Sequence, residues 1–342
     1  MAAIANPEKI IVFRTDRIGD MVVSTPVFRA IKQAFPSCRL SVCAGRASRE
    51  VILNNPRIDA IHIRTGDDSI GDYRQEGFDT AVALFSDKWV MRTIRRSHIP
   101  RRIGPLSGIG SYFCYNCGIR QKRSASVRHE AEYNLELLRQ LGIDSKDTRP
   151  EIFLTNEERK EAVRILEKAG IRRPFACVHP GMGNSALNWP PEYYAAMADT
   201  IRREFGLEPV LTGGPADRDR VDAVVKECAR EPLSLLGATS LRQLAAVFEK
   251  AEFVIAPSTG PLHIASALDT LTFSVYSPVQ VHSVMRWGPL GTNSHTLTPQ
   301  VACDGKYTCA GKACPDFFCM KTVTPEEMTG CIRHNYSGSA CQ

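Results

Sequence analysis

No apolar run in the 342 residues approaches the roughly 18–20 residues that a membrane-spanning helix needs. The opening residues, MAAIANPEKI, also lack the basic segment and the apolar segment that make up a secretory leader. Hydrophobic residues make up 43% of the chain and charged residues 23%, as in ordinary globular proteins. We therefore expect a cytoplasmic globular protein, and the length favours two domains.

Acidic residues are missing from one long segment. Between Lys88 and His129 there is no Asp or Glu, whereas ten Lys and Arg residues occur there, more than the net surplus of +6. A local positive field of this kind attracts anionic partners, such as a phosphorylated substrate or an anionic lipid surface. A solvated helix face followed by a basic loop would have the same composition. No nucleic-acid-binding motif accompanies the segment, so we expect no nucleic acid partner.

The G-x-G-x-x-G fingerprint of dinucleotide-binding proteins is also missing. Gly19 is the only glycine in the stretch FRTDRIGD, which follows the first apolar run, and the later pair Gly181 and Gly183 lacks the third glycine. This pattern disfavours a nicotinamide-dependent enzyme. It leaves open whether FRTDRIGD binds phosphate, takes part in catalysis or forms a solvated turn.

Cysteine is abundant, but its spacing is not that of the common zinc sites. Of the twelve cysteines, Cys303, Cys309, Cys314 and Cys319 fall within seventeen residues. Their spacings are wider than those of a paired zinc knuckle, and thiols of a protein without a leader stay reduced. We expect a packed, thiol-rich loop and no metal or cofactor, with a metal site on these four cysteines as the alternative.

Strand-like and helix-like patterns alternate along the first half of the chain. The strand-like runs are Lys9–Arg14, Arg39–Ala44, Ala60–Arg64 and Phe78–Phe85. A helix is predicted from Ser24 to about Phe35, because Pro26 suits a first helical turn. Residues 104–126 show no periodicity, and we expect them to form a loop.

The alternation restarts after Pro150. A capping box at Thr155 opens a helix, and strand-like runs follow at Phe175–His179, Pro209–Thr212, Phe253–Ala256 and Thr272–Tyr276. Two such series predict an α/β protein with two doubly wound domains, each with a parallel sheet. We place these domains at residues 1–150 and 151–325, with a closing helix and tail at 326–342.

Doubly wound proteins bind ligands at the carboxyl ends of their strands. In the second half, three loops after strands join Gly or Pro to hydroxyl or amide residues just before a helix: HPGMGNSALNWPPE from His179, TGGPADRD from Thr212 and APSTGPLHIA from Ala256. The N–H groups at such helix starts bind a diphosphate without a metal. Each loop alone would also fit an ordinary capped turn, but three together favour a diphosphate site.

Three blocks in this order resemble glycosyltransferase family 9, the heptosyltransferases of bacterial lipopolysaccharide synthesis: IIVFRTDRIGDMVVSTPVFRAIKQAFP, VHPGMGNSALNWPPEYYAAMA and VIAPSTGPLHIASALDTLTFSVYSP. The resemblance covers the chain from about residue 9 to residue 325. It implies a GT-B fold, in which two Rossmann-like domains face each other across a cleft, and a metal-independent, inverting transfer. It also implies a nucleotide-sugar donor, ADP-heptose, bound by the C-terminal domain, and an anionic inner-core glycolipid or related surface glycan, bound by the N-terminal domain.

The resemblance assigns roles on the acceptor side. Asp20 falls at the position of the proposed general base, and an inverting transfer needs a carboxylate that accepts the proton of the acceptor hydroxyl; a simple helix cap is the alternative. Arg14 falls where the family carries a basic residue facing the acceptor, Arg17 is a further candidate, and Asp16 reads as a turn residue. The basic segment adds four acceptor candidates, which would also hold the enzyme on the inner face of the cytoplasmic membrane: Arg95, Arg96, Arg101 and Arg102.

On the donor side, the resemblance places the diphosphate against one loop, with a second loop opposite it. The residues are Ser258, Thr259, Gly260 and His263 in the first loop and Gly181, Gly183, Asn184 and Ser185 in the second, with Asp217 as a candidate for the ribose. A buried structural histidine is the alternative for His263. Leu187 stands where many members carry a lysine, and Ser258 where an acid is common. Three alternatives remain: another sugar nucleotide used for O-antigen or capsule, a sugar-nucleotide epimerase, and a non-catalytic binding protein.

Overall fold

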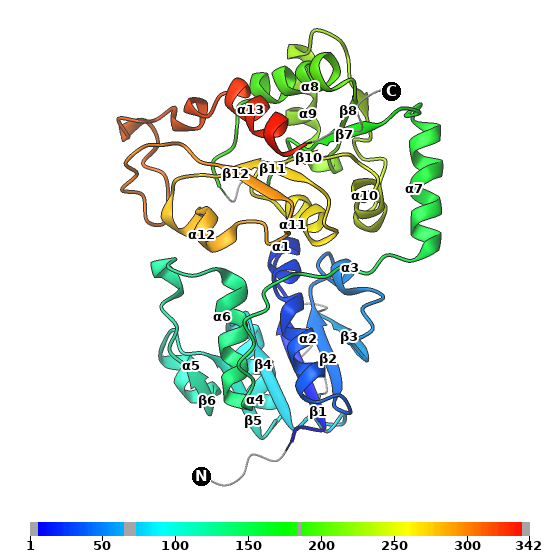
Figure 1. The fold of residues 1–342 in the computed structure, drawn as a ribbon. Helices are drawn as coiled ribbons and strands as arrows, with labels where there is room; N and C mark the ends of the chain where they lie inside the picture. Colours follow the sequence, from blue (N-terminus) through cyan, green and yellow to red (C-terminus); the bar gives the residue numbers. More distant parts are fainter. Residues whose placement is uncertain (1–5, 65–72, 184–185, 337–342) are drawn as a thin grey trace. The chain divides into compact units, whose positions relative to one another are not determined.

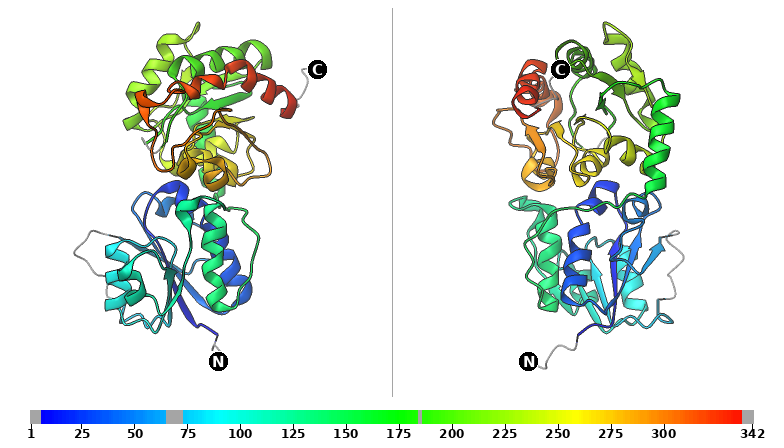
Figure 2. Two further views of the ribbon diagram at one scale, coloured as in Figure 1. Left: turned by 90° about the vertical axis from the view of Figure 1, so that its left-hand side faces the viewer. Right: turned by 45° about the vertical axis from the view of Figure 1, so that its right-hand side comes forward.

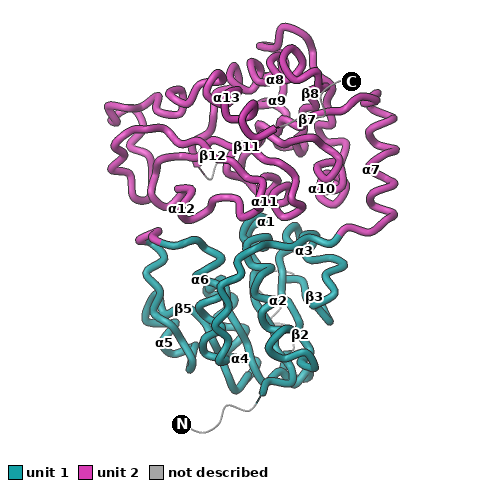
Figure 3. The backbone as a smooth tube through the Cα atoms, in the orientation of Figure 1, with its two compact units in different colours: residues 1–124, 128–153 teal, residues 125–127, 154–342 magenta. Residues whose placement is uncertain are grey.

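The computed structural model describes residues 6–64, 73–183 and 186–336 (Figure 1). The chain divides into two units, the first made of Met1–Ser124 with Arg128–Phe153 and the second of Ala125–Val127 with Leu154–Gln342 (Figure 3). The main division follows Phe153, whereas the sequence-based division was placed after Pro150.

Unit 1 contains a parallel sheet of six strands in the order β3-β2-β1-β4-β5-β6. The strands are β1 (Lys9–Arg14), β2 (Arg39–Ala44), β3 (Ala60–Ile63), β4 (Thr80–Ala83), β5 (Arg101–Pro105) and β6 (Cys117–Ile119). The helices are α1 (Ile18–Val22), α2 (Thr25–Ala34), α3 (Arg49–Ile52), α4 (Lys88–Arg96), α5 (Ile109–Cys114) and α6 (Glu130–Leu137). Strand β1 reads as a continuous apolar run because helices cover both faces of a parallel sheet.

Helices α2 and α6 lie side by side on one face of this sheet (Figure 2). On the other face, Ile11 and Phe13 of β1 share a buried cluster with Trp89 and Ile94 of α4. The alternating residues of a strand point to opposite faces, which is why the single run KIIVFR contributes to both layers.

Unit 2 contains a second parallel sheet of six strands, in the order β12-β11-β10-β7-β8-β9. The strands are β7 (Phe175–Val178), β8 (Glu208–Leu211), β9 (Leu233–Ser234), β10 (Val254–Ile255), β11 (Thr272–Val275) and β12 (Ser294–Leu297). The helices are α7 (Asn156–Lys168), α8 (Pro191–Phe205), α9 (Arg218–Glu227), α10 (Leu241–Phe248), α11 (Gly260–Ala267), α12 (Val284–Trp287) and α13 (Pro325–Asn335).

The two sheets have the same topology. Counted from the first strand of each unit, both follow the order 3-2-1-4-5-6 of the classical dinucleotide-binding fold. The strand order reverses between β1 and β4 in unit 1 and between β7 and β10 in unit 2. Ligand sites of open α/β sheets lie at this reversal, next to the carboxyl ends of the strands. The prediction of two doubly wound, parallel α/β units is therefore confirmed.

The prediction of a loop over residues 104–126 was wrong. This segment contains the end of β5, helix α5, strand β6 and a 3-10 turn at Arg123–Ala125. The missed helix has six residues and the missed strand three, which is too short for a periodic pattern to appear. The 3-10 turn matters for the site, because Arg123 lies in it.

Two further observations complete the fold. In unit 2, the indole Nε1–H of the buried Trp189 donates to the carbonyl of Val323 at 2.8 Å, so the loop after β7 is attached to the segment that precedes α13. Among the helices of the described residues, none combines the length and the apolar character needed to cross a membrane.

Candidate functional site

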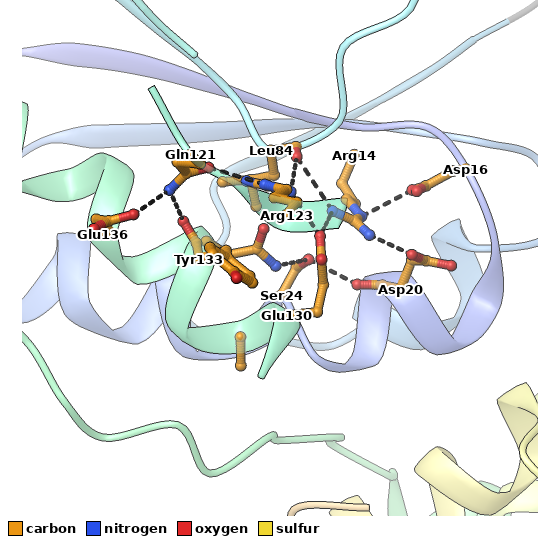
Figure 4. A network of polar contacts seen from close by, with 12 residues as sticks. Arg14, Asp16, Asp20, Ser24, Leu84, Gln121, Arg123, Glu130, Tyr133 and Glu136 are labelled. Atoms are coloured by element: carbon orange, nitrogen blue, oxygen red, sulfur yellow. Dashed lines mark hydrogen bonds and ion pairs between the residues drawn. The ribbon is translucent and has the colours of Figure 1, made fainter. Parts of the chain in front are cut away.

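The candidate site of unit 1 lies at the strand reversal between β1 and β4. Arg14 is the last residue of β1, Leu84 directly follows β4, and Asp16 and Asp20 lie in the loop and the short helix α1 that follow β1. Figure 4 shows these residues around the guanidinium of Arg14. The stretch FRTDRIGD is therefore at the position where doubly wound sheets bind ligands.

Arg14 is buried and each of its three guanidinium nitrogens has an acidic partner. Nε lies 2.8 Å from Oδ1 of Asp16, and Nη2 contacts Oδ1 of Asp20. Nη1 lies 3.3 Å from Oε1 of Glu130 and also donates to the carbonyl of Leu84. Burial by itself would lower the pKa of Arg14, but the three carboxylates outweigh it and raise that pKa. Arg14 is thus a permanent cation beneath the loop.

A second arginine completes the network (Figure 4). Arg123 donates from Nη1 to Oε1 of the buried Glu130 at 2.6 Å and to the carbonyl of Leu84 at 3.1 Å. Its Nε donates to Gln121, whose amide donates in turn to the carbonyl of Tyr133 in α6. Glu130 therefore has two guanidinium partners, and the segment between β6 and α6 is attached to the carboxyl end of the sheet.

Asp20 lies in the first turn of α1 and is partly exposed, at 15% of its side chain. Its backbone carbonyl accepts a hydrogen bond from Ser24 Oγ at 2.7 Å, and Ser24 accepts from Asn134 of α6 at 3.1 Å. The helix that carries Asp20 is therefore attached to α6.

Asp16 is more than the turn residue that the sequence indicated. Its side chain, 15% exposed like that of Asp20, forms an ion pair with Arg14. Burial raises the pKa of Asp16 to about 7; Arg14 opposes this shift and Asp20 adds to it. The signal in the sequence was the placement of two aspartates within six residues of one arginine at the end of a buried strand.

The predicted basic acceptor residues lie in different places. Arg17 is exposed and precedes α1. Arg95 and Arg96 end α4, whereas Arg101 and Arg102 open β5. The structure does not bring these last four together with Asp20, because a helix that returns between parallel strands ends at the opposite edge of the sheet.

The strand register shows this separation directly. Arg101 pairs with Thr80, which pairs in turn with Ile10, four residues before Arg14. Four residues of strand span about 13 Å. Arg102 also has structural partners, since its Nε donates to the carbonyl of Cys114 at 2.7 Å.

In unit 2, the loops after β7 and β8 contact each other. A Cβ atom on Gly181 would lie 2.4 Å from Cγ of Asp217, so only glycine fits beside this carboxylate. Asp217 Oδ2 accepts the N–H of Gly214 at 2.8 Å, which fixes the turn before α9. His179 Nδ1 lies 3.0 Å from Thr212 Oγ1. Burial lowers the pKa of His179 to about 4, against an opposing effect of Asp217, so its ring is neutral at pH 7.

The loop after β10 leads into α11. Because β10 is the sheet neighbour of β7, this loop leaves the sheet beside the loop that carries Gly181. The side chain of Thr259 does not cap α11, which begins at Gly260. His263 is buried within this helix, and Ser258 hydrogen-bonds the buried Tyr276 hydroxyl. The roles of Ser258, Thr259, Gly260 and His263 in donor binding stay predictions.

Two predicted donor residues, Asn184 and Ser185, lie outside the described residues. Among the described residues, none places a heavy atom within 4 Å of the position where a Cβ on Gly183 would stand. For Gly181 and Asp217 the structure accounts for the residue types by packing and turn formation. Their roles in donor binding stay predictions.

The thiol-rich loop lies on unit 2. Cys303, Cys309, Cys314 and Cys319 line one pocket of about 550 Å³, which Leu187 also lines. All four are free thiols. Within the described ranges, no three His, Cys, Asp or Glu side chains are placed so that they could hold a metal ion.

Comparison with known proteins agrees with this fold and with the sequence motifs. Residues 94–313, more than half of the chain, match the model of glycosyltransferase family 9 (heptosyltransferase). A putative glycosyltransferase of Haemophilus influenzae is 26% identical over 83% of this chain and 86% of its own length. Lipopolysaccharide heptosyltransferase 3 of Escherichia coli is 24% identical over 75% of this chain and 79% of its own length.

Solved structures show the same fold. A family 9 glycosyltransferase from Veillonella parvula superposes with a TM-score of 0.80 at 20% identity, covering 96% of this chain and 97% of its own. The ADP-heptose lipopolysaccharide heptosyltransferase II of Escherichia coli superposes with a TM-score of 0.77 at 19% identity, covering 95% and 98%. Two Rossmann-like units, the matching family model and the three sequence blocks lead to one assignment: the chain belongs to glycosyltransferase family 9 and is a glycosyltransferase with the GT-B fold.

Proposed function

We propose that this glycosyltransferase moves heptose from ADP-heptose to a lipopolysaccharide core, with Asp20 as the general base. The observation that carries the proposal is the partly exposed carboxylate of Asp20 at the strand reversal of unit 1, in contact with the buried cation Arg14. Relatives named lipopolysaccharide heptosyltransferase 3 and lipopolysaccharide core heptosyltransferase OpsX support the choice of sugar and acceptor.

In the proposed reaction, the acceptor oxygen forms a bond to the anomeric carbon of heptose while the bond from that carbon to the β-phosphate oxygen breaks. Asp20 takes the proton of the acceptor hydroxyl, and ADP leaves with the electron pair of the broken bond. The configuration at the anomeric carbon inverts because attack and departure occur on opposite sides. A carboxylate that is partly exposed, as that of Asp20 is, can reach the acceptor hydroxyl for this proton transfer.

Unit 2 is proposed to bind the departing diphosphate and to stabilise its negative charge. The N–H groups at the start of α11, after Thr259, supply hydrogen-bond donors and the positive end of the helix dipole. The loop at Gly181 and Gly183 brings backbone close to the same sheet edge. Both features serve a diphosphate without any lysine at position 187.

Arg14 is assigned a different part from the one that the resemblance implied. Since all three of its nitrogens contact carboxylates, it holds Asp20 in place. Arg17, which is exposed beside the same loop, is the better candidate for contact with an anionic acceptor.

A ligand screen combined with a transfer assay tests the proposed donor. ADP and ADP-heptose are expected to raise the melting temperature, because a ligand at 100 times its Kd stabilises by about 2.7 kcal/mol. UDP and GDP at the same concentration serve as matched controls. If only UDP or GDP raised the melting temperature, the donor would be a UDP- or GDP-sugar and the assignment of ADP-heptose would be wrong. Product formed from the sugar nucleotide without an acceptor would overturn transfer in favour of an epimerase.

We also propose that unit 1 binds the anionic inner face of the cytoplasmic membrane, where the acceptor lipid is present. Helix α5 exposes Ile109 and Phe113 at 81% and 71%, together with Tyr112. It packs against α4, where Cys114 Sγ contacts the carbonyl of Met91, and α4 exposes Arg92 and Arg95. Exposed apolar side chains beside cations are the composition of an interfacial membrane contact.

Vesicle sedimentation tests this contact. The protein is expected to bind vesicles that contain anionic lipid, to bind less as salt rises, and not to bind purely zwitterionic vesicles. Phe113→Ser is expected to weaken binding several-fold, because an exposed ring no longer enters the interface. Phe318→Ser, at an exposed phenylalanine of unit 2, is the control. Equal loss for both variants would rule out a specific role of α5.

A further inference from the structure

We propose that Asp16 and Asp20 form a coupled pair of carboxylates on Arg14, in which Asp16 sets the proton affinity of Asp20. The inference rests on the proposed function, since it concerns the base of that transfer. It assigns Asp16 as a positioning and tuning residue; Asp20 remains the group that contacts the acceptor.

The geometry of the guanidinium carries the argument. Nε and Nη2 form the edge that a single carboxylate ordinarily takes with both oxygens. Here that edge is divided: Oδ1 of Asp16 lies on Nε at 2.8 Å, and Oδ1 of Asp20 contacts Nη2. Two separate carboxylates therefore contact adjacent nitrogens of one guanidinium. Two carboxyl groups that contact adjacent nitrogens of one guanidinium do not ionise independently of each other.

The charges around the pair do not balance. Arg14 and Arg123 face three carboxylates, those of Asp16, Asp20 and Glu130. Glu130 is buried and has both guanidinium groups as partners. The excess negative charge consequently falls on the edge shared by Asp16 and Asp20.

The other charged groups near this loop do not remove the excess. Arg64 contacts Thr15 Oγ1 at 3.4 Å, but its Nη1 is also paired with Asp87 at 2.6 Å. Arg17 lies between the two aspartates in sequence and is exposed, so water screens its charge.

Asp16 is the member of the pair that holds the proton in the resting enzyme. Its pKa is raised to about 7, first by burial, and Asp20 adds to the shift. Neither Oδ1 of Asp16 nor Nε of Arg14 has a well-formed hydrogen bond, although both atoms are buried. Their contact is therefore an ion pair of poor geometry. Asp16 therefore carries a proton below about pH 7 and loses it above.

This coupling changes the strength of the base. When Asp20 accepts the acceptor proton, the pair holds that proton next to the charge of Asp16. A second negative charge close to Asp20 raises its affinity for the proton, and so stabilises the transition state in which the proton is moving. The transfer rate is therefore expected to rise with pH as Asp16 ionises.

The test compares the pH dependence of kcat/KM in the wild type and in Asp16→Asn. The wild-type rate is expected to exceed the variant rate about two- to threefold at pH 6 and about tenfold or more at pH 8.5, because the amide supplies no charge. Dividing the wild-type kcat/KM by the variant kcat/KM at each pH removes any effect of substrate titration. Asp144→Asn, at an exposed ion pair, is the matched control and is expected to give a constant ratio. A ratio of wild type to Asp16→Asn that is the same at every pH would overturn the inference.

A second variant and a second measurement cover the case in which Asp16→Asn fails to fold. Asp16→Glu keeps a carboxylate and is expected to retain a rise of rate with pH; a flat profile would contradict coupling. In the wild type labelled with carbon-13 at the aspartate carboxyls, one resonance is expected to titrate near pH 7. Titration of all of them below pH 5 would overturn the inference.

Asp20→Asn separates the two levels of the proposal. One outcome is that Asp20→Asn abolishes transfer while kcat/KM of Asp16→Asn has the same pH dependence as that of the wild type. In that case the assignment of Asp20 as the base is supported and the coupling with Asp16 is wrong. If Asp20→Asn transfers at the wild-type rate, the base assignment falls and the inference falls with it.

Discussion

Replacing Asp20 by Asn is expected to lower the rate of sugar transfer by about 10²–10⁴-fold, the usual contribution of a positioned general base. The amide has nearly the size of the carboxylate but does not accept the proton of the acceptor hydroxyl. The melting temperature with and without ADP measures whether donor binding persists. We expect the shift caused by ADP to be unchanged, because the loops proposed to bind the diphosphate belong to unit 2.

The control for this prediction is Asp144→Asn, which makes the same chemical change at an exposed ion pair with Arg139. It is expected to transfer sugar at the wild-type rate. A transfer rate for Asp20→Asn within about threefold of the wild type would show that another group removes the proton. Loss of the ADP shift together with transfer would show that the substitution disturbs more than the base.

Replacing Arg14 by Met is expected to lower the free energy of unfolding by about 3–5 kcal/mol, as for other buried ion pairs that lose one partner. The side chain is 2% exposed, and its removal leaves Asp16, Asp20 and Glu130 without the cation that they share. Of these three carboxylates, Glu130 keeps a cationic partner, because it also pairs with Arg123. Urea unfolding at pH 8, compared with the wild type, measures the loss.

The loss should depend on pH in a definite direction. Without Arg14, the folded-state pKa values of these carboxyls rise above their unfolded values, so the folded state binds more protons than the unfolded state. Stability then falls as pH rises through the unfolded and on to the folded pKa values. The difference between variant and wild type is therefore expected to be smaller at pH 5 than at pH 8.

Arg139→Met is the matched control for Arg14→Met. Arg139 is 55% exposed, its partner Asp144 is 65% exposed, and exposed pairs contribute about 0–1 kcal/mol. If Arg14→Met costs no more than this control, or the same at both pH values, the buried network does not stabilise unit 1 in the way described.

Much of the fold was accessible from local sequence patterns. Continuous apolar runs such as KIIVFR, separated by capped helices such as the one opened at Thr155, indicate parallel strands with returning helices. These signals depend on neighbouring residues, which is why they survive without tertiary information. Short elements such as α5 and β6 escaped, because six and three residues do not establish a period.

The basic segment illustrates a limit of reading charge along the chain. Its arginines are neighbours in sequence, but α4 returns across the sheet, so Arg95 and Arg101 lie at the edge away from Asp20. Arg123 of the same segment instead reaches the carboxyl edge and pairs with Glu130. Position in the fold, and not proximity in sequence, decides which cation acts on the site.

The sequence by itself determined the two α/β series, the loops that follow their strands, and Asp20 as the candidate base, because strand and helix patterns and the family blocks are local features. Only the tertiary structure decided what Arg14 does. Its partner Glu130 lies 116 residues away in sequence, at the start of α6, so the contact between the two side chains forms only when unit 1 folds.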